Sequence, residues 1–117
     1  MKYIKTFTAL FAALVLLSAE IVFAMPPSNV AASYDSANGM VTITASHNVN
    51  DGKKHFVMSM AVSEGGNQIL SKKYTEQKSN EVFTDSVKLP GVKQGSKITV
   101  LLTCNIMGAV KDTITVK

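Results

Sequence analysis

The chain has 117 residues, a formal net charge of +4, two histidines and a single cysteine. Its 12 basic residues are all lysines, and the lack of arginine argues against phosphate or nucleic-acid recognition, for which bidentate arginine contacts are the usual means. One cysteine excludes an internal disulfide, so a domain of this size depends on its apolar core, on a bound metal or on self-association.

The first residues have the pattern of a signal peptide. Two lysines precede an apolar run at residues 7–17, and Val22 and Ala24 suit the positions that signal peptidase reads. The run is shorter than the about 20 residues that span a bilayer, which argues against a stable membrane anchor. We predict a cleaved signal peptide over residues 1–24, one domain over residues 25–117 and a periplasmic or secreted location.

Beyond the leader, apolar and polar residues alternate with a period of two, which is typical of β-strands. This alternation marks five segments: residues 41–46, 55–62, 82–89, 98–102 and 110–116. The segment at residues 98–102 is apolar enough to be a central strand. Met58 and Met60 lie two positions apart, so we expect both on one strand face and packed in the core.

Turn signals separate these segments, and none shows an apolar stripe at helical spacing. The signals are Asn38-Gly39, Gly65-Gly66-Asn67, Pro90-Gly91 and Gln94-Gly95. Many short strands with frequent turns predict an all-β fold, an immunoglobulin-like β-sandwich of about seven antiparallel strands.

Three residues could carry metal chemistry. His47 ends one predicted strand and His55 begins the next, so the loop of residues 48–54 should bring both imidazoles to one rim of the sandwich. Cys104 also lies at a strand end, before a turn that contains glycine. Imidazole and thiolate are suitable donors for iron, copper or zinc. The alternative is two surface histidines and an inert buried thiol, since free cysteine often behaves as a small apolar residue.

These residues belong to a longer pattern that resembles a known family. The pattern comprises His47, His55-Phe56-Val57, Gly95-Ser96-Lys97-Ile98-Thr99-Val100 and Cys104-Asn105-Ile106-Met107-Gly108. From about residue 29 to residue 116, the chain resembles the desulfoferrodoxin/neelaredoxin family of superoxide reductases. The resemblance implies an immunoglobulin-like sandwich with one non-haem iron, four histidines around the metal, one axial cysteine thiolate and an open position for superoxide.

The resemblance also implies a role for each matching residue. His47 and His55 match equatorial ligands, and Cys104 matches the axial thiolate that is central to the reaction. Met107 stands where the family has a histidine and is expected as a weak ligand.

Two family features lack a direct match. The family's first histidine appears here as Asn29 or Ser28, and its neighbouring lysine, which attracts superoxide, has no counterpart there. Lys54, or its neighbour Lys53, could take the lysine's catalytic role if the loop folds over the site.

The reduced ligand set leaves the identity of the metal open. The resemblance implies a mononuclear non-haem iron, whereas two His, one Cys and one Met form the ligand set of blue-copper centres. Copper or another soft metal is therefore the alternative, and a protein without a functional metal is the third.

We expect an exported superoxide-reductase-like protein that reduces superoxide or performs related one-electron chemistry with an external electron donor. The alternative is a non-enzymatic module that binds copper or a protein partner, so the sequence leaves enzymatic activity open. The mild positive charge would attract superoxide or another small anion. The family often associates through its sandwich faces, so the resemblance allows a homo-oligomer, although the sequence does not give the oligomeric state.

Overall fold

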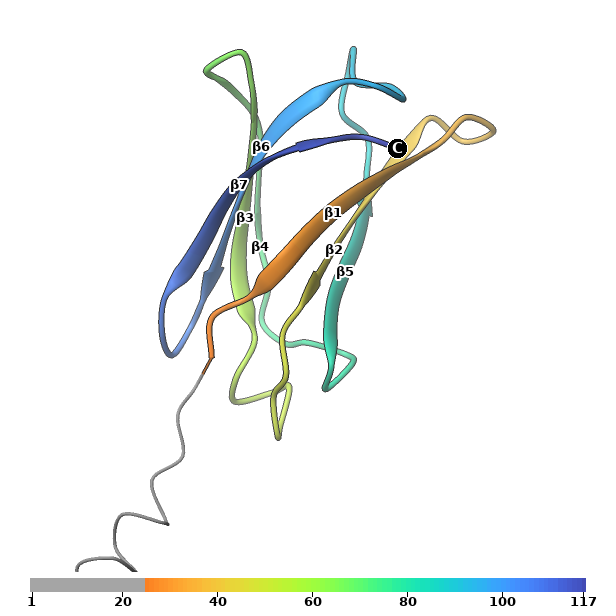
Figure 1. The fold of residues 1–117 in the computed structure, drawn as a ribbon. Helices are drawn as coiled ribbons and strands as arrows, with labels where there is room; N and C mark the ends of the chain where they lie inside the picture. Colours follow the sequence, from red (N-terminus) through yellow and green to blue (C-terminus); the bar gives the residue numbers. More distant parts are fainter. Residues whose placement is uncertain (1–24) are drawn as a thin grey trace, which may run out of the picture.

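The computed structural model describes residues 25–117, which fold as two packed β-sheets (Figure 1). The strands are β1 (Ser28–Asp35), β2 (Met40–Ser46), β3 (Val57–Glu64), β4 (Asn67–Lys73), β5 (Val82–Val87), β6 (Lys97–Cys104) and β7 (Ala109–Thr115). The signal peptide predicted for residues 1–24 lies outside the described residues. Within residues 25–117, no helix has the length and hydropathy needed to cross a membrane.

The sheet order confirms the predicted all-β sandwich of antiparallel strands. One sheet has the order β1-β2-β5 and the other β4-β3-β6-β7, and every pair of neighbouring strands is antiparallel. Strand β6 lies between β3 and β7, so the segment predicted to be central is an interior strand. The strands at residues 28–35 and 67–73, which were not among the five segments marked by alternation, complete the set of seven.

The core consists of the inward-facing residues of both sheets. Its fully buried members include Val41 and Ile43 of β2, Met60 of β3, and Ile98 and Leu102 of β6. These aliphatic side chains alternate with exposed or half-buried residues along each strand, as a sandwich with two solvated outer faces requires. Each buried aliphatic side chain contributes about 1.5–3 kcal/mol relative to an exposed one.

A β-bulge corrects the prediction for Met58. The pairing of β3 with β6 shifts register between Val57 and Ser59, and the extra residue is Met58, which is 41% exposed. A bulge inverts the alternation of side chains on one side of it. Val57 and Met60 therefore both face the core, and the expectation that Met58 packs there is wrong.

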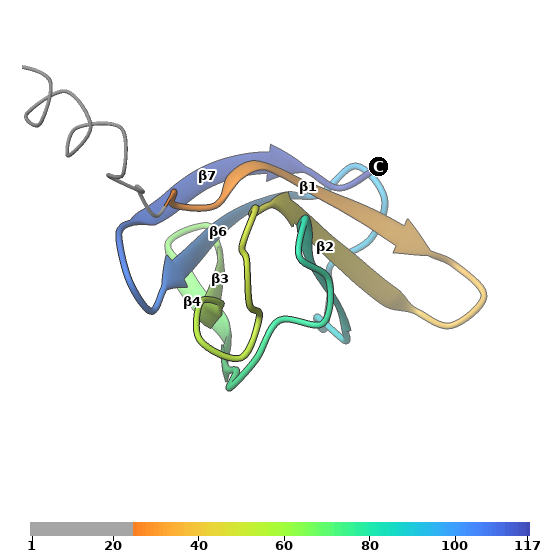
Figure 2. The ribbon, with the colours of Figure 1, turned by 90° about the horizontal axis from the view of Figure 1, so that it is seen from below.

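The two open sides of the sandwich are closed by different means. On one side, β1 meets the C-terminal residues: the amide of Tyr34 donates to the carbonyl of Lys117, and that of Lys117 donates to Ala32. Figure 2 shows β1 and β7 side by side along this edge.

On the other side, polar side chains link β4 to β5. Lys72 forms an ion pair with Asp85 (2.7 Å), and the Tyr74 hydroxyl donates to the same carboxylate (2.5 Å). Burial raises the pKa of Asp85, but the hydrogen bonds and the charge of Lys72 outweigh burial and hold that pKa below its usual range. Burial and the Asp85 carboxylate together raise the pKa of Tyr74. Asp85 is therefore ionised and Tyr74 protonated at neutral pH.

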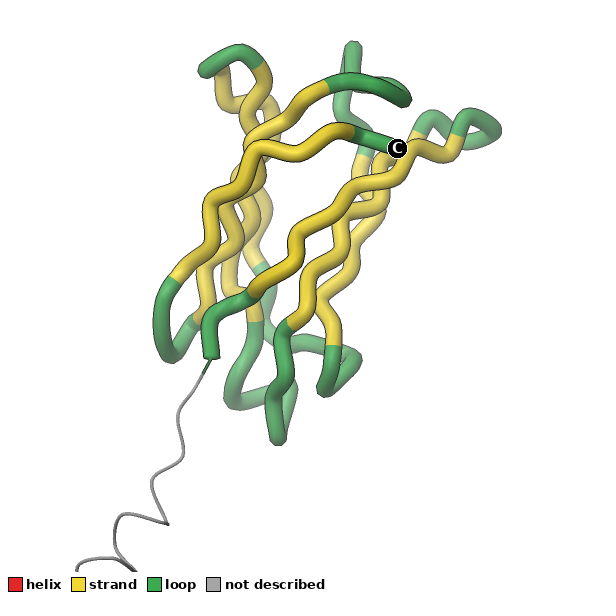
Figure 3. The backbone as a smooth tube through the Cα atoms, in the orientation of Figure 1, coloured by secondary structure: helices red, strands yellow, loops and turns green. Residues whose placement is uncertain are grey.

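Three connections lie at one end of the sandwich, at the bottom of Figure 3: the β2–β3 loop, the β4–β5 connection and the β6–β7 turn. The loop that follows β2 is bonded to the residues that precede β5, since the amide of His47 donates to Glu81 and that of Val49 donates to Asn80. In Figure 2, seen from below, these two connections run next to each other. The predicted loop between the two histidines is therefore part of a larger bonded rim.

We expect Tyr74→Phe to lower the free energy of unfolding by about 1–2 kcal/mol at pH 7, because it removes a hydrogen bond to a charged acceptor. The folded-state pKa of Asp85 lies below its unfolded value of about 3.9, so its stabilising effect is complete above that pH and lost as pH falls through the folded pKa. The difference between variant and wild type should therefore shrink in acid. Urea unfolding between pH 7 and pH 3 measures it.

Tyr34→Phe is the matched control. Within the described residues, the Tyr34 hydroxyl makes no side-chain hydrogen bond, so this change should stay within about 0.5 kcal/mol of wild type. Equal effects of the two substitutions would contradict the proposed link between β4 and β5.

Candidate metal centre

The rim brings three strand ends together. His47 directly follows β2, His55 lies two positions before the start of β3, and Cys104 is the last residue of β6. The alternation of β6 continues from Val100 and Leu102 to Cys104, so the cysteine faces inward and is 4% exposed. The predicted convergence of two imidazoles and the thiol is therefore what the structure shows. We call these three residues the His–Cys cluster.

The distances within the His–Cys cluster suit a single ion. One potential ligand atom from each residue can be chosen so that all three lie within 4.8 Å of one another. His55 Nε2 lies 3.1 Å from Cys104 Sγ, and the two imidazole rings meet edge to face with their centroids 4.7 Å apart. His47 and Cys104 are buried and His55 is half-buried, so the cluster has one partly open side.

His47 supplies the strongest sign that these residues fit a metal. Its Nδ1 lies 2.7 Å from Gln77 Oε1, whereas its buried Nε2 has no hydrogen-bond partner within residues 25–117. An unsatisfied buried polar atom costs about 1–3 kcal/mol. A metal ion at this nitrogen would remove that cost. In a metal-binding histidine, the ring nitrogen that does not bind the metal usually forms a hydrogen bond, as Nδ1 of His47 does here.

Cys104 lies in a turn that orients its sulfur. The amide of Ile106 donates to Sγ (3.5 Å), and the amide of Cys104 donates to the carbonyl of Gly108 (3.0 Å). Gly108 has a φ of 75°, and a Cβ on it would lie 3.1 Å from the side chain of Pro26, so both conformation and space favour glycine. The amide donor orients the sulfur, and the thiolate is the form of cysteine that binds metals.

The hydrogen bonds of Asn105 explain why an asparagine follows the cysteine in the Cys-Asn-x-x-Gly segment. Its Oδ1 accepts from the amide of Phe56 (2.9 Å), its Nδ2 donates to the carbonyl of Lys54 (2.9 Å), and its own amide donates to Phe56 (3.0 Å). These bonds fix the backbone on both sides of His55 against the end of β6. Asn105 therefore sets the approach of His55 to Cys104.

The electrostatics of the rim favour a neutral imidazole at His55. Burial is the main cause that lowers the pKa of His55, and repulsion from His47 lowers it further. A neutral imidazole keeps one nitrogen lone pair for a metal or a hydrogen bond. At neutral pH, one ring nitrogen of His55 therefore carries no proton, and a metal can bind there without displacing one.

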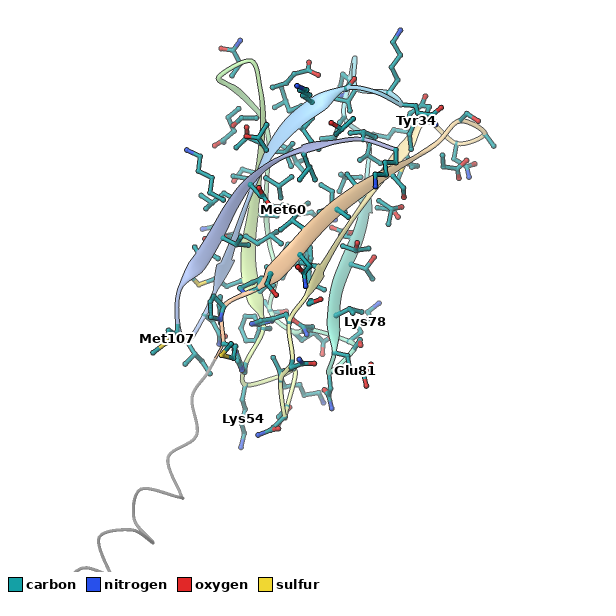
Figure 4. The ribbon with its side chains drawn as sticks, viewed as in Figure 1. Tyr34, Lys54, Met60, Lys78, Glu81 and Met107 are labelled. Carbon is teal, nitrogen blue, oxygen red and sulfur yellow. The ribbon has the colours of Figure 1, made fainter. Side chains whose placement is uncertain are left out.

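The structure does not bring the other predicted site residues into the His–Cys cluster. Met107 is 53% exposed in the β6–β7 turn, and Figure 4 shows its side chain pointing away from the sandwich. Lys54 is exposed and also points outward in Figure 4, and Lys53 is exposed as well. The ligand role of Met107 and the catalytic role of Lys54 stay predictions.

The start of β1 has no imidazole that could replace the first histidine of the superoxide reductase family. Ser28 and Asn29 are both exposed, and Asn29 has a φ of 52°, next to the register shift between β1 and β2.

Gln77 was not foreseen from the sequence. It lies in the polar stretch of residues 75–80, which has the composition of a solvated loop, yet it is only 6% exposed and touches His47. A single glutamine among polar neighbours carries no periodic or motif signal that could have distinguished it.

Neither a protein-family model nor a curated protein matches this chain. Among solved structures, a crystal structure of superoxide reductase in the oxidized state is similar to it, with 14% sequence identity and a TM-score of 0.47. The similarity covers 83% of this chain and 94% of that chain. A function for this chain has to be inferred from the residues of the rim.

We expect Gly52→Ala to disrupt the rim. Gly52 is buried, and a Cβ on it would lie 1.9 Å from the backbone carbonyl oxygen of Gln77, so one of the two loops must move. The free energy of unfolding should fall by about 3 kcal/mol, at the upper end for overpacking. Chemical unfolding measures this change, and an accompanying loss of metal affinity should be visible by titration.

Gly65→Ala serves as its control. Gly65 has a φ of 56° and open space around it, so alanine there costs only backbone strain, about 1–2 kcal/mol, far from the rim. A Gly52→Ala protein that is as stable as Gly65→Ala and binds metal normally would contradict the close packing of the two loops.

Proposed function

We propose that the His–Cys cluster holds one metal ion and that this protein is a superoxide-reductase-like iron protein. The observation that carries the proposal is the buried Nε2 of His47, which has no hydrogen-bond partner within residues 25–117, in a residue that forms one compact set of potential ligands with His55 and Cys104. The residues that match the superoxide reductase family in sequence are the same three. One-electron transfer to superoxide is the chemistry that a bound iron would supply.

The residues of the chain have separate tasks in this proposal. His47 and His55 bind through neutral nitrogens, and Cys104 contributes a thiolate whose charge the Ile106 amide partly balances. Burial of His47 and Cys104 excludes water from one side of the cluster, while the half-buried His55 marks the side from which a small ligand enters.

Superoxide is the proposed substrate, and a separate protein or small molecule is the proposed electron donor. The excess of lysine over acidic residues and the exposed Lys53 and Lys54 on the loop before His55 favour the approach of a small anion. Lys54 is the proposed proton donor to the reduced product, which requires its loop to turn toward the cluster.

Copper is the second candidate metal, and the small number of histidines in the donor set supports it. The chain contains only two histidines, and both already belong to the cluster, so no further imidazole can complete a four-histidine iron site. Two imidazoles and one thiolate suit copper in an electron-transfer protein. The metal that binds tightly and its reaction with superoxide distinguish the two functions.

We expect the purified protein to bind one equivalent of Fe(II) or copper and to show a thiolate-to-metal charge-transfer band when oxidised. Cys104→Ala should abolish the band, because the only thiol of the chain is removed. Metal analysis with optical and electron paramagnetic resonance spectra of the loaded protein measures both, and rapid mixing with superoxide then tests the iron form.

Met107→Leu is the matched control for Cys104→Ala, because it alters the same turn without removing a thiol. It should keep the band and change metal affinity by less than about tenfold, as expected for a weak ligand. A band that persists in Cys104→Ala would exclude thiolate ligation. A wild-type protein that binds neither metal would overturn the proposed function.

Export is proposed on the pattern of residues 1–24 alone. Expression of the full chain in a bacterium should yield a mature protein in the periplasmic or secreted fraction that begins at Met25. Mass spectrometry of the intact protein measures the mass and N-terminal sequencing the first residue. An Ala24→Asp chain should remain unprocessed, and cleavage of this variant at the same bond would contradict the predicted site.

A further inference from the structure

We propose that Gln77 is a positioning residue that fixes His47 in the tautomer with Nδ1 protonated and Nε2 free, so that one nitrogen donor is formed before any metal arrives. This inference rests on the proposed metal centre, and its test is independent of metal. It concerns a residue outside the ligand set, on the connection between β4 and β5.

The orientation of the Gln77 amide follows from its hydrogen bonds. Its Nε2 lies 2.9 Å from the carbonyl oxygen of His47 and 2.8 Å from that of Ser79. Both are acceptors, so both hydrogens of the amide nitrogen are used, and a flipped amide would place its oxygen against two carbonyl oxygens. Oε1 is therefore the atom that faces His47.

The amide orientation determines the tautomer of His47. Gln77 Oε1 has no hydrogen and can only accept, so Nδ1 of His47 must donate across the 2.7 Å contact. A neutral imidazole carries one hydrogen on nitrogen, which leaves Nε2 with a lone pair. Nε2 is the buried atom without a partner among residues 25–117, and His47 is a member of the His–Cys cluster.

The backbone holds Gln77 in place independently of its side chain. Its amide donates to the carbonyl of Gly52 (2.8 Å), and its own carbonyl oxygen fills the space where a Cβ of Gly52 would lie. Four residues later, the carbonyl of Glu81 accepts from the amide of His47 (2.9 Å). Gln77 and His47 are thus fixed on two segments that are bonded to each other, which is the condition for a preformed ligand.

His55 lacks this support. It is half-buried, and within the described residues its only side-chain hydrogen bond is that of Nε2 with Cys104. The two histidines therefore differ: His47 is fixed before binding, whereas His55 can change partner from the thiol to a metal. This difference makes His55 an internal control for any change at Gln77.

The experiment uses the metal-free protein, labelled with ¹⁵N, and long-range ¹H–¹⁵N correlation spectra of both imidazoles at pH 7.5. In the wild type, His47 should show one protonated nitrogen, Nδ1, and one unprotonated nitrogen, Nε2. In Gln77→Leu, both His47 nitrogens should move toward the average of two tautomers, while the His55 pattern stays unchanged. Affinity for added Fe(II) or Cu(II) should fall 10–100-fold, as is typical when the hydrogen-bond partner of a ligand is lost.

Gln77→Glu tests the acceptor role separately from packing. A carboxylate also accepts from Nδ1, so this variant should keep the hydrogen on that nitrogen, although its second oxygen then lies against the two carbonyl oxygens and its charge also favours a proton on Nε2. If Gln77→Leu does not fold, the wild-type and Gln77→Glu spectra still decide.

Three results would overturn the proposal: a wild-type His47 protonated at Nε2, an unchanged His47 pattern in folded Gln77→Leu, or a mixed tautomer in folded Gln77→Glu. Failure of the wild type to bind metal would overturn the proposed function instead. The assignment of Gln77 would then be decided by the spectra of the metal-free protein alone.

Discussion

Inward alternation along β6 determines where the chemistry of this protein can occur. Ile98, Val100 and Leu102 face the second sheet and are fully buried, and the next inward position is Cys104. The cysteine lies at the end of the core, where the apolar row meets the loops. A shift of β6 by one residue would turn the whole row outward, so the stability of the sandwich itself maintains the position of the thiol.

The rim around the thiol is more extensively hydrogen-bonded than its polar sequence suggests. Asn105 ties the end of β6 to the residues around His55, and Gln77 ties the β4–β5 connection to His47. The result is a fold of residues 25–117 that keeps one buried nitrogen without a partner among them, at a cost of about 1–3 kcal/mol. A protein that maintains such an atom against this cost fits a binding site better than a purely structural end of a sandwich.

The sequence predicted the sandwich and the meeting of three donors because both depend on simple rules. Period-two alternation identified the interior strand that carries Cys104, and the loop between two strand ends was enough to place His47 near His55. The prediction for Met58 failed because a bulge depends on the pairing of β3 with β6, which residue spacing does not reveal. Gln77 could not be found because its burial depends on the packing of its loop against Gly52. In addition, Gln77 is 30 positions away in the chain from His47, the histidine that it supports. The outward direction of Met107 and Lys54 likewise depends on turn conformation rather than on residue type.

Burial of the lone thiol also governs how the chain behaves among copies of itself. A disulfide between two copies requires their Cβ atoms to approach within about 4 Å. Cys104 is 4% exposed behind the β6–β7 turn, so two folded copies cannot reach this separation. In an oxidising compartment, where an accessible unpaired thiol would cross-link, the folded chain stays free of covalent dimers. Any self-association of the folded protein is then reversible, and the sulfur remains available to its two histidines.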